Sequence, residues 1–189
     1  MDSVAHRMAN ALVGNQLDAA ALEVTWLGPE LRIEQETRLA VTGADLHATL
    51  DGADVPLGVA LRCCAGSVLR FGDRRSGVRA YIAFDGGVAV PDVLGSCATH
   101  LPSGLGGVEG RQLMAGDCVP IGDPKRGLVS EVESQAEVRV GGAAVAPVGD
   151  AAQRVGSAGG ARLRVLPGPQ ADECGPSVLG VLQRTRYTV

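Results

Sequence analysis

Aromatic residues and long apolar runs are both scarce in this chain. Its 189 residues include one Trp, two Tyr and two Phe, so aromatic side chains make up only 3% of the sequence. A surface that stacks nucleic-acid bases on aromatic rings therefore has few residues from which to be built. No apolar run approaches the ~20 residues that a membrane-spanning helix needs, and the N-terminus shows neither a basic leader nor a continuous apolar segment. We expect a cytoplasmic, globular chain whose core is filled by Val, Leu, Ile and Ala.

The sequence also lacks an excess of positive charge. Charged residues make up 20% of the chain, and 17 Lys and Arg against 21 Asp and Glu give a net charge of −4. The basic residues are dispersed, apart from the pairs Arg74-Arg75 and Lys125-Arg126. This balance gives no global attraction for nucleic acid or for an anionic membrane, so neither is expected as a partner.

The cysteines do not follow a metal-ligand or disulfide pattern. Their number is odd and no Cys-x-x-Cys occurs, so we predict no zinc site, no other metal and no disulfide framework. We expect the five cysteines to be reduced and mostly buried thiols, with Cys63 and Cys64 on opposite faces of a strand. For Cys97 a nucleophilic thiol is an alternative, although the sequence identifies no His-Asp pair to activate it.

The motifs of several independent enzymes are missing as well. The sequence contains no His-Glu-x-x-His, no Gly-x-Ser-x-Gly and no dinucleotide fingerprint. This argues against a self-contained metallohydrolase, serine esterase or nicotinamide enzyme. It favours a subunit that shares its active site with a partner.

The patterns that are present predict a mainly β chain with one short N-terminal helix. Apolar residues recur at helical spacing over residues 3–13 before the stop signal Gly14-Asn15, and one face of this helix should pack on a sheet. From Ala20 onward, short apolar runs alternate with turn residues at the spacing of a β-barrel or sandwich, and Asp51-Gly52 predicts a tight hairpin. Strands are expected at 21–27, 31–34, 38–42, 47–50, 67–71 and 79–84, with turns at 28–29, 43–45 and 72–73.

The second part of the chain is predicted to be less regular. Glycine and alanine dominate after Asp123-Pro124, and we interpret residues 123–161 as a flexible linker. Residues 162–189 are expected to hold a short strand at 162–166, a short helix near 177–183 and a last strand at 187–189. About 28 residues cannot bury a core of their own, so this part should dock on the first domain, residues 1–122.

Glycines and small hydroxyl residues crowd around a few ionisable side chains between residues 86 and 117. Glycine allows positive φ and close approach of the backbone to a ligand, so this composition suits a surface where main-chain amides face a substrate or partner. A set of tight turns is the alternative interpretation, because the segment has neither phosphate-loop spacing nor a lysine.

The same segment resembles the signature of the biotin-dependent carboxyltransferase-like family, which includes the C component of 5-oxoprolinase, allophanate hydrolase subunit two and the related part of urea carboxylase. In that family a strand ending in Gly-Gly leads through a Pro-containing turn to Gly-Ser, a Ser/Thr pair, Gly-Gly, Glu-Gly-Arg and Gly-Asp. The chain carries these elements from Gly86-Gly87 to Gly116-Asp117. Further family-like motifs occur in order at residues 7–15, 20–23, 27–29, 42–45, 71–72 and 164–170.

The resemblance implies a cyclophilin-like β-barrel for residues 1–122 and the start of a second barrel-like half at 162–189. It also implies a subunit of an ATP-dependent enzyme that processes an amide or lactam. Such a subunit works with a homologous partner, similar to the B component of 5-oxoprolinase or to allophanate hydrolase subunit one. ATP would act together with partner subunits, and biotin would come on a separate carrier domain. Compared with the family, the chain looks incomplete at both ends, so a non-catalytic interaction or regulatory module, or an inactive fragment, is the alternative.

The candidate catalytic residues are Arg111, Glu109, Asp117 and Thr99. Three of them match the Glu-Gly-Arg and Gly-Asp elements of the family. Arg111 could fork onto a carboxylate or phosphate, while Glu109 or Asp117 orients it or acts as a base. A structural ion pair explains these charged residues equally well.

The candidate substrate-binding residues are Ser96, His100, Gly106, Gly107 and Asp45. The Ser96 hydroxyl could hydrogen-bond a carbonyl and the His100 imidazole could exchange protons near neutral pH. Capping of the small turn after residue 94 is the alternative for the polar residues at 96–100. For Asp45 the alternative is a turn former whose carboxylate accepts local amides.

Overall fold

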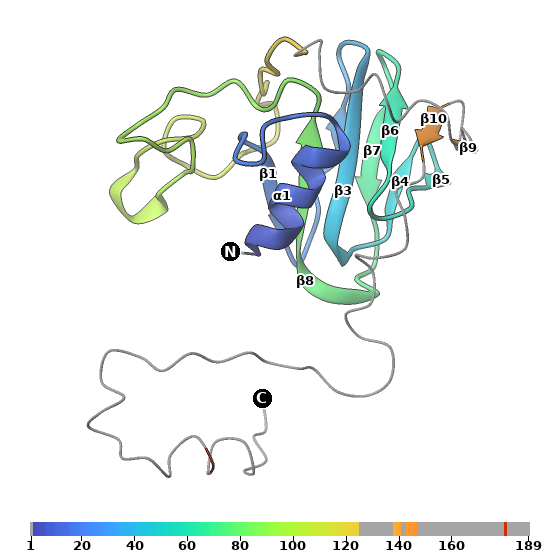
Figure 1. Ribbon diagram of the computed structural model, residues 1–189, viewed down its shortest axis with the longest axis horizontal. Helices are drawn as coiled ribbons and strands as arrows, with labels where there is room; N and C mark the ends of the chain where they lie inside the picture. The colour runs from blue at the N-terminus through green and yellow to red at the C-terminus, as the bar shows by residue number, and fades with distance from the viewer. Residues whose placement is uncertain (1, 125–137, 141–142, 147–179, 181–189) are drawn as a thin grey trace. The chain divides into compact units, whose positions relative to one another are not determined.

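The computed structural model describes residues 2–124, 138–140, 143–146 and Gly180. The chain divides into two compact units, Met1–Gln153 and Arg154–Val189. The strands predicted at 162–166 and 187–189 lie outside the described residues, and of the helix predicted near 177–183 only Gly180 is described. The N-terminal helix and the strands described next belong to the first unit (Figure 1).

The first element is the predicted N-terminal helix, α1 (Ser3–Leu12). The Asp2 carboxylate accepts a hydrogen bond from the Ala5 amide at 3.0 Å, which satisfies a free amide of the first turn. Gly14, with φ of 81°, follows the last turn in the left-handed region that such stops favour. The helix is thus confirmed, ending one residue earlier than predicted.

Within the described residues, ten strands form two antiparallel sheets. The six-stranded sheet has the order β1-β8-β3-β6-β10-β9, and the four-stranded sheet has the order β2-β7-β4-β5. In the first sheet the strands are β1 (Leu22–Thr25), β8 (Ser76–Phe84), β3 (Thr37–Asp45), β6 (Ala60–Cys63), β10 (Ala143–Ala146) and β9 (Val138–Val140). In the second they are β2 (Leu31–Arg32), β7 (Val68–Phe71), β4 (Ala48–Leu50) and β5 (Ala53–Asp54).

Side chains alternate between two apolar clusters along the central strands β3 and β8. Because successive residues of a strand point to opposite faces, one set packs with residues of the second sheet and the other set packs on α1. The set shared between the two sheets includes Leu39, Val41, Ile82, Phe84, Leu50 and Leu69. The set beneath the helix includes Ala40, Tyr81, Ala83, Ala5, Ala9 and Val13. The small alanines on both sides let α1 lie close to the sheet, as Figure 1 shows.

The predicted hairpin is confirmed. β4 pairs with β5 in antiparallel register, and the two residues between them, Asp51 and Gly52, have φ of 51° and 85°. Positive φ at both central residues is the geometry that an Asp-Gly dipeptide favours. The mainly β class with one helix is also confirmed, whereas closure of the sheets into a cyclophilin-like barrel stays a prediction.

Two details of the strand assignment differ from expectation. The turn predicted at residues 43–45 is wrong, because these residues continue β3 with an irregular register against β8. Gly43 has φ of 86°, and a side chain there would collide with the Arg79 carbonyl, so the glycine forms a bulge rather than a turn. The strand β6 is absent from the predicted set, and it ends at Cys63, so Cys64 lies beyond it. The expected burial of the cysteines is wrong for most of those described, because Cys63 is buried but Cys64 and Cys118 are exposed and Cys97 is half-buried.

The predicted linker contains regular structure. Val138–Val140 and Ala143–Ala146 form β9 and β10, and β10 pairs with β6. The sequence is compatible with both strands, because Val-Arg-Val alternates apolar and polar residues and Ala-Ala-Val-Ala is a short apolar run. The domain boundaries at 122 and 161 stay a prediction.

Candidate functional site

The glycine-rich loop, residues 86–122, leaves β8 and returns to it without forming a strand of its own. Its base is closed by a bridge between Val88 and Ile121 and by hydrogen bonds from Ala89 to Pro120 at 2.8 Å and from Gly122 to Gly87 at 2.9 Å. Figure 1 shows the loop extending outward from the sheets, in green to yellow. The loop is therefore a projecting segment with a fixed base.

Two asparagines hold this base to the end of α1. The Asn15 side chain donates to the Phe84 carbonyl at 2.8 Å and to the Asn10 side-chain oxygen at 2.9 Å, and it accepts from the Gly86 amide at 2.9 Å. Asn10 is fully buried and donates to the Ala19 carbonyl at 2.8 Å. One side chain thus fixes the point where the chain passes from β8 into the loop.

Neither asparagine is among the residues predicted to be functional. Asn15 enters the prediction only as part of a helix stop, and both belong to the family-like motif at residues 7–15. One sequence feature could have identified Asn10 as a buried residue: it lies on the face of the helix that carries the small apolar residues Ala5 and Ala9. A buried polar side chain needs partners, so its position predicts a network.

Thr99, Gly106 and Gly107 come together in the outer part of the loop. A bridge joins His100 to Leu105, with the His100 amide donating to the Leu105 carbonyl at 2.8 Å. Both glycines have positive φ, and a side chain would collide with the Ala98 carbonyl at position 106 or with the Thr99 hydroxyl at position 107. These glycines therefore allow close packing of the loop on itself.

Arg111 is the centre of the charged cluster. Its guanidinium forks onto Asp117, with hydrogen bonds of 2.7 and 3.0 Å to the two carboxylate oxygens. It also donates twice to one oxygen of Glu109, at 3.1 and 2.8 Å, and once to the Gln112 carbonyl at 3.0 Å. These contacts engage all five N–H donors of the guanidinium. The geometry is that of a structural ion pair, the alternative that the sequence leaves open.

The ion pair changes the titration of its members. Hydrogen bonding from Arg111 is the main cause that lowers the pKa of Asp117 to about 2, and the Met114 amide, which donates to the same carboxylate at 2.8 Å, adds to it. The same contact with Asp117 raises the pKa of Arg111 above its usual value. Asp117 is thus a carboxylate at any physiological pH, which suits it as an anchor and makes it a weak base.

Ser96 and His100 are exposed and take part in local turns. The Ser96 hydroxyl accepts from the Ala98 amide at 3.1 Å, and one ring nitrogen of His100, Nδ1, lies 2.9 Å from the Ser103 hydroxyl. His100 precedes the short 3₁₀ helix Leu101–Ser103. These contacts match the capping alternative, and a role toward substrate stays a prediction.

Asp45 lies away from the other candidates. It pairs with Ser76 at the first end of β8, whereas the glycine-rich loop follows Phe84 at the other end of that strand. Its carboxylate accepts from the His47 amide at 3.0 Å, which is the turn-forming contact expected as its alternative. The structure therefore does not bring Asp45 together with the loop.

The remaining reactive groups of this part of the chain form no second centre. Cys97 is half-buried, with its sulfur 3.9 Å from the Val90 carbonyl. Within the described residues, no group of three His, Cys, Asp or Glu side chains is placed to hold a metal ion. A depression of about 720 Å³ lies between α1 and the segment that follows it, and none of the predicted site residues lines it.

The described part of the chain contains no helix with the length and hydropathy of a membrane span.

Comparison with known proteins relates this geometry to one family. The whole chain, residues 1–189, matches the model of the carboxyltransferase domain, subdomains A and B. It is 41% identical over 175 residues to the C component of 5-oxoprolinase from Escherichia coli, an alignment that covers 92% of this chain and 49% of that protein. It is 36% identical over 155 residues to urea amidolyase of Saccharomyces cerevisiae, covering 75% of this chain and 8% of that protein.

Solved structures lead to the same group of proteins. The urea amidolyase of K. lactis superimposes with a TM-score of 0.64 and 38% identity, over 66% of this chain and 8% of that one. The chain spans about half the length of the bacterial 5-oxoprolinase component and a small part of the amidolyases.

Proposed function

This chain belongs to the carboxyltransferase-domain family that the glycine-rich segment resembles, and we propose that it serves as part of an ATP-dependent enzyme acting on an amide or lactam. The substrate class is that of 5-oxoprolinase, allophanate hydrolase or urea carboxylase. It works with a homologous partner subunit, similar to the B component of 5-oxoprolinase or to allophanate hydrolase subunit one, in the cytoplasm.

The observation that carries this proposal is the pre-organised loop. Asn15 fixes its root, Gly106 and Gly107 let it pack on itself, and Arg111 ties residues 109–117 together. A site that stabilises a developing oxyanion needs donors that are already in place, because reorganisation during the reaction reduces their effect. A glycine-rich backbone held by these contacts, with exposed polar residues, meets that need.

The roles within the loop follow from the contacts. Arg111 and Asp117 keep the loop in shape, and Glu109, the more exposed of the two carboxylates, is the member that a substrate can replace on the guanidinium. The exposed hydroxyls of Ser96 and Thr99 and the imidazole of His100 lie in the same loop and would bind the substrate's polar groups.

ATP and biotin are assigned to other subunits in this proposal. Arg111 is the only Lys or Arg between residues 86 and 122, and all its N–H donors are engaged. The loop sets three carboxylates, Asp92, Glu109 and Asp117, against this one guanidinium, so a triphosphate would meet net negative charge and the residues present do not fit it. We therefore derive no step of the reaction from ATP or biotin on this chain.

A non-catalytic interaction module is the second candidate, and one observation favours it. The loop exposes large apolar side chains, and Leu94 is 94% exposed. Exposed apolar groups gathered on one segment mark a surface that contacts another protein. The others that share this property are Leu101, Leu105, Leu113 and Met114.

Mixing the full chain with the candidate partner subunit separates these functions. We would measure 5-oxoproline-dependent ADP release, with complex formation followed in parallel by sedimentation. The enzyme proposal expects turnover that Arg111→Ala abolishes and that Gln112→Ala, whose side chain is exposed, leaves intact. A stable complex without turnover would move the assignment to the interaction module.

A further inference from the structure

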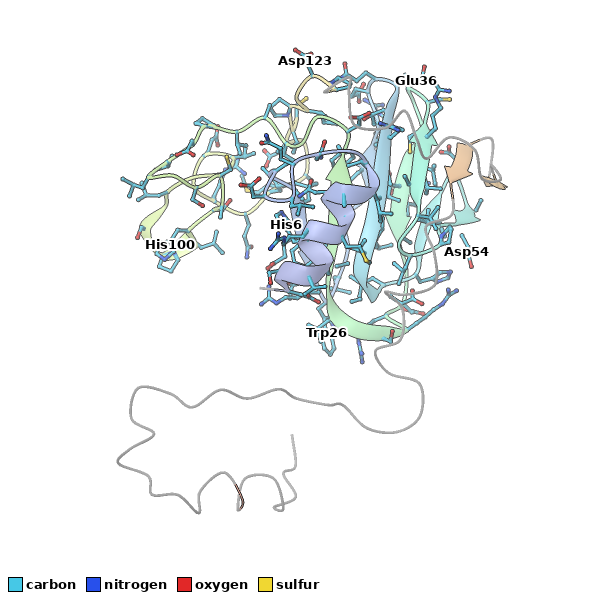
Figure 2. All side chains as sticks on the ribbon, viewed as in Figure 1. His6, Trp26, Glu36, Asp54, His100 and Asp123 are labelled. Carbon is cyan, nitrogen blue, oxygen red and sulfur yellow. The ribbon has the colours of Figure 1, made fainter. Side chains whose placement is uncertain are left out.

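A second surface lies at the opposite end of β8 from the glycine-rich loop. We call it the tryptophan tip, residues 26–29 and 72–78. Its two segments are held together by a hydrogen bond from the Trp26 amide to the Val78 carbonyl at 2.8 Å and by the ring of Phe71, which leaves no room for a side chain at Gly28. Figure 2 labels Trp26 at this end and His100 in the loop.

Trp26 is held out toward solvent in a strained conformation. It is the chain's one tryptophan, it is 53% exposed, and its φ is 67°, a value that bulky L residues rarely adopt. Its neighbour Leu27 is 77% exposed, and Val78 beside it is also exposed. Strain of this kind persists only where the surrounding structure fixes it, and it gathers at functional surfaces.

The tip carries an unneutralised cation against the tryptophan ring. The Arg74 guanidinium carbon lies 4.6 Å from the centroid of the Trp26 ring, and the side chain donates to the Gly77 carbonyl at 3.3 Å. Within the described residues no carboxylate pairs with Arg74, whereas Arg70 pairs with Glu30 and Arg75 contacts Asp54.

Arg74 is the cation of the tip that a partner can pair with, because Glu30 and Asp54 already pair with the neighbouring Arg70 and Arg75. A symmetric contact between two tips would bring a second Arg74, and not a carboxylate, to this guanidinium, which disfavours a second copy as the occupant. One unpaired arginine on an acidic protein gives little attraction to an anionic membrane, where each basic residue contributes only modestly.

We propose that the tryptophan tip docks an acidic, apolar segment of another protein. Trp26, Leu27 and Val78 take an apolar side chain of that segment, and Arg74 pairs with its carboxylate. Tryptophan and arginine together are the residues that most often dominate protein interfaces. Because the tip and the glycine-rich loop lie at opposite ends of β8, this surface is separate from the proposed enzymatic one.

The test uses displayed 12-residue peptides selected on the full chain, with the enriched peptides then synthesised. Emission of the one tryptophan reports binding directly at Trp26. We expect enriched sequences with Asp or Glu next to Leu or Phe, a shift of the emission, and a Kd raised at least tenfold by Arg74→Glu. Trp26→Ala, followed by calorimetry, should have the same effect. Arg62→Glu, at an exposed arginine of β6 paired with Glu36, is the matched control and should leave Kd unchanged.

Four results would overturn the proposal. The selection enriches no peptide, or it enriches only peptides whose Kd does not respond to Arg74→Glu and Trp26→Ala. Self-association of the chain that Trp26→Ala abolishes would identify a second copy as the occupant. Co-sedimentation with phosphatidylserine vesicles that depends on Trp26 would identify a membrane. Circular dichroism of each variant confirms that the fold is retained, because both substituted side chains are exposed at the surface.

Discussion

Replacing Asn15 by Ala should loosen the glycine-rich loop at its root. The substitution removes hydrogen bonds to the Phe84 carbonyl, the Gly86 amide and the Asn10 side chain. A hydrogen bond contributes about 0.5–1.5 kcal/mol net, and a buried group left without a partner costs about 1–3 kcal/mol. Water reaches half-buried Asn15 but not buried Asn10, so we expect a loss of about 2–3 kcal/mol in the free energy of unfolding.

That loss is large compared with the whole stability of a domain, about 5–15 kcal/mol. It corresponds to a fall in Tm of about 4–12 °C for a chain of this size. Urea unfolding followed by circular dichroism measures the free energy. Hydrogen exchange shows where in the chain the stability is lost. Relative to wild type, exchange should accelerate more at the amides of Gly86, Val88 and Ala89 than at those of central β3.

Two variants control this experiment. Gln16→Ala removes an adjacent exposed side chain and should change the free energy of unfolding by less than about 0.5 kcal/mol. Asn15→Asp keeps an acceptor for the Gly86 amide but lacks donors for the Phe84 carbonyl and Asn10. It should therefore lower the free energy of unfolding, while the Gly86 amide exchanges more slowly than in Asn15→Ala. If Asn15→Ala behaves like Gln16→Ala, the asparagine does not hold the loop.

Three further outcomes follow from other contacts. The pKa of Asp117 is lowered to about 2, so its contribution to stability is complete above its unfolded pKa of about 4 and is lost as the pH falls through 2. Exchange of the loop amides should accelerate over this pH range in wild type but not in Asp117→Asn. Gly107→Ala should be about 1–3 kcal/mol less stable than Gly95→Ala in urea unfolding, because both positions have positive φ but only at 107 would the new side chain collide with Thr99. Burial raises the pKa of Cys63 to about 12, so a thiol reagent at pH 8 should label it only after unfolding.

Local patterns predicted much of the fold. The helix at Ser3–Leu12 and the hairpin at Asp51-Gly52 depend on residues close in the sequence, and both are confirmed. The bulge at Gly43 depends on the Arg79 carbonyl, 36 positions away, and a glycine next to Asp45 looks like a turn when its partner strand is unknown. β6 was missed for a similar reason, since only its pairing with β3 makes this short segment a strand.

The site was predictable in its members but not in their contacts. The family motif identifies Glu109, Arg111 and Asp117 together, and the structure joins them in one ion cluster. That all five donors of the guanidinium are engaged follows from the fold of the loop, which a motif does not contain. The roles of Asn10 and Asn15 depend on Gly86, about 70 positions later, so sequence spacing could not connect them.

The saturation of Arg111 determines what the loop needs from a substrate. An anion can bind the guanidinium only by displacing a carboxylate, and Asp117 is the poorer candidate because it is less exposed and also accepts from the Met114 amide. Glu109 is held by one oxygen and is 72% exposed at its side chain, so its release costs less. Displacing it leaves the fork to Asp117, and with it the shape of the loop, intact. Under the proposed function we therefore expect a substrate carboxylate to replace Glu109 on Arg111, while Asp117 continues to hold the same guanidinium.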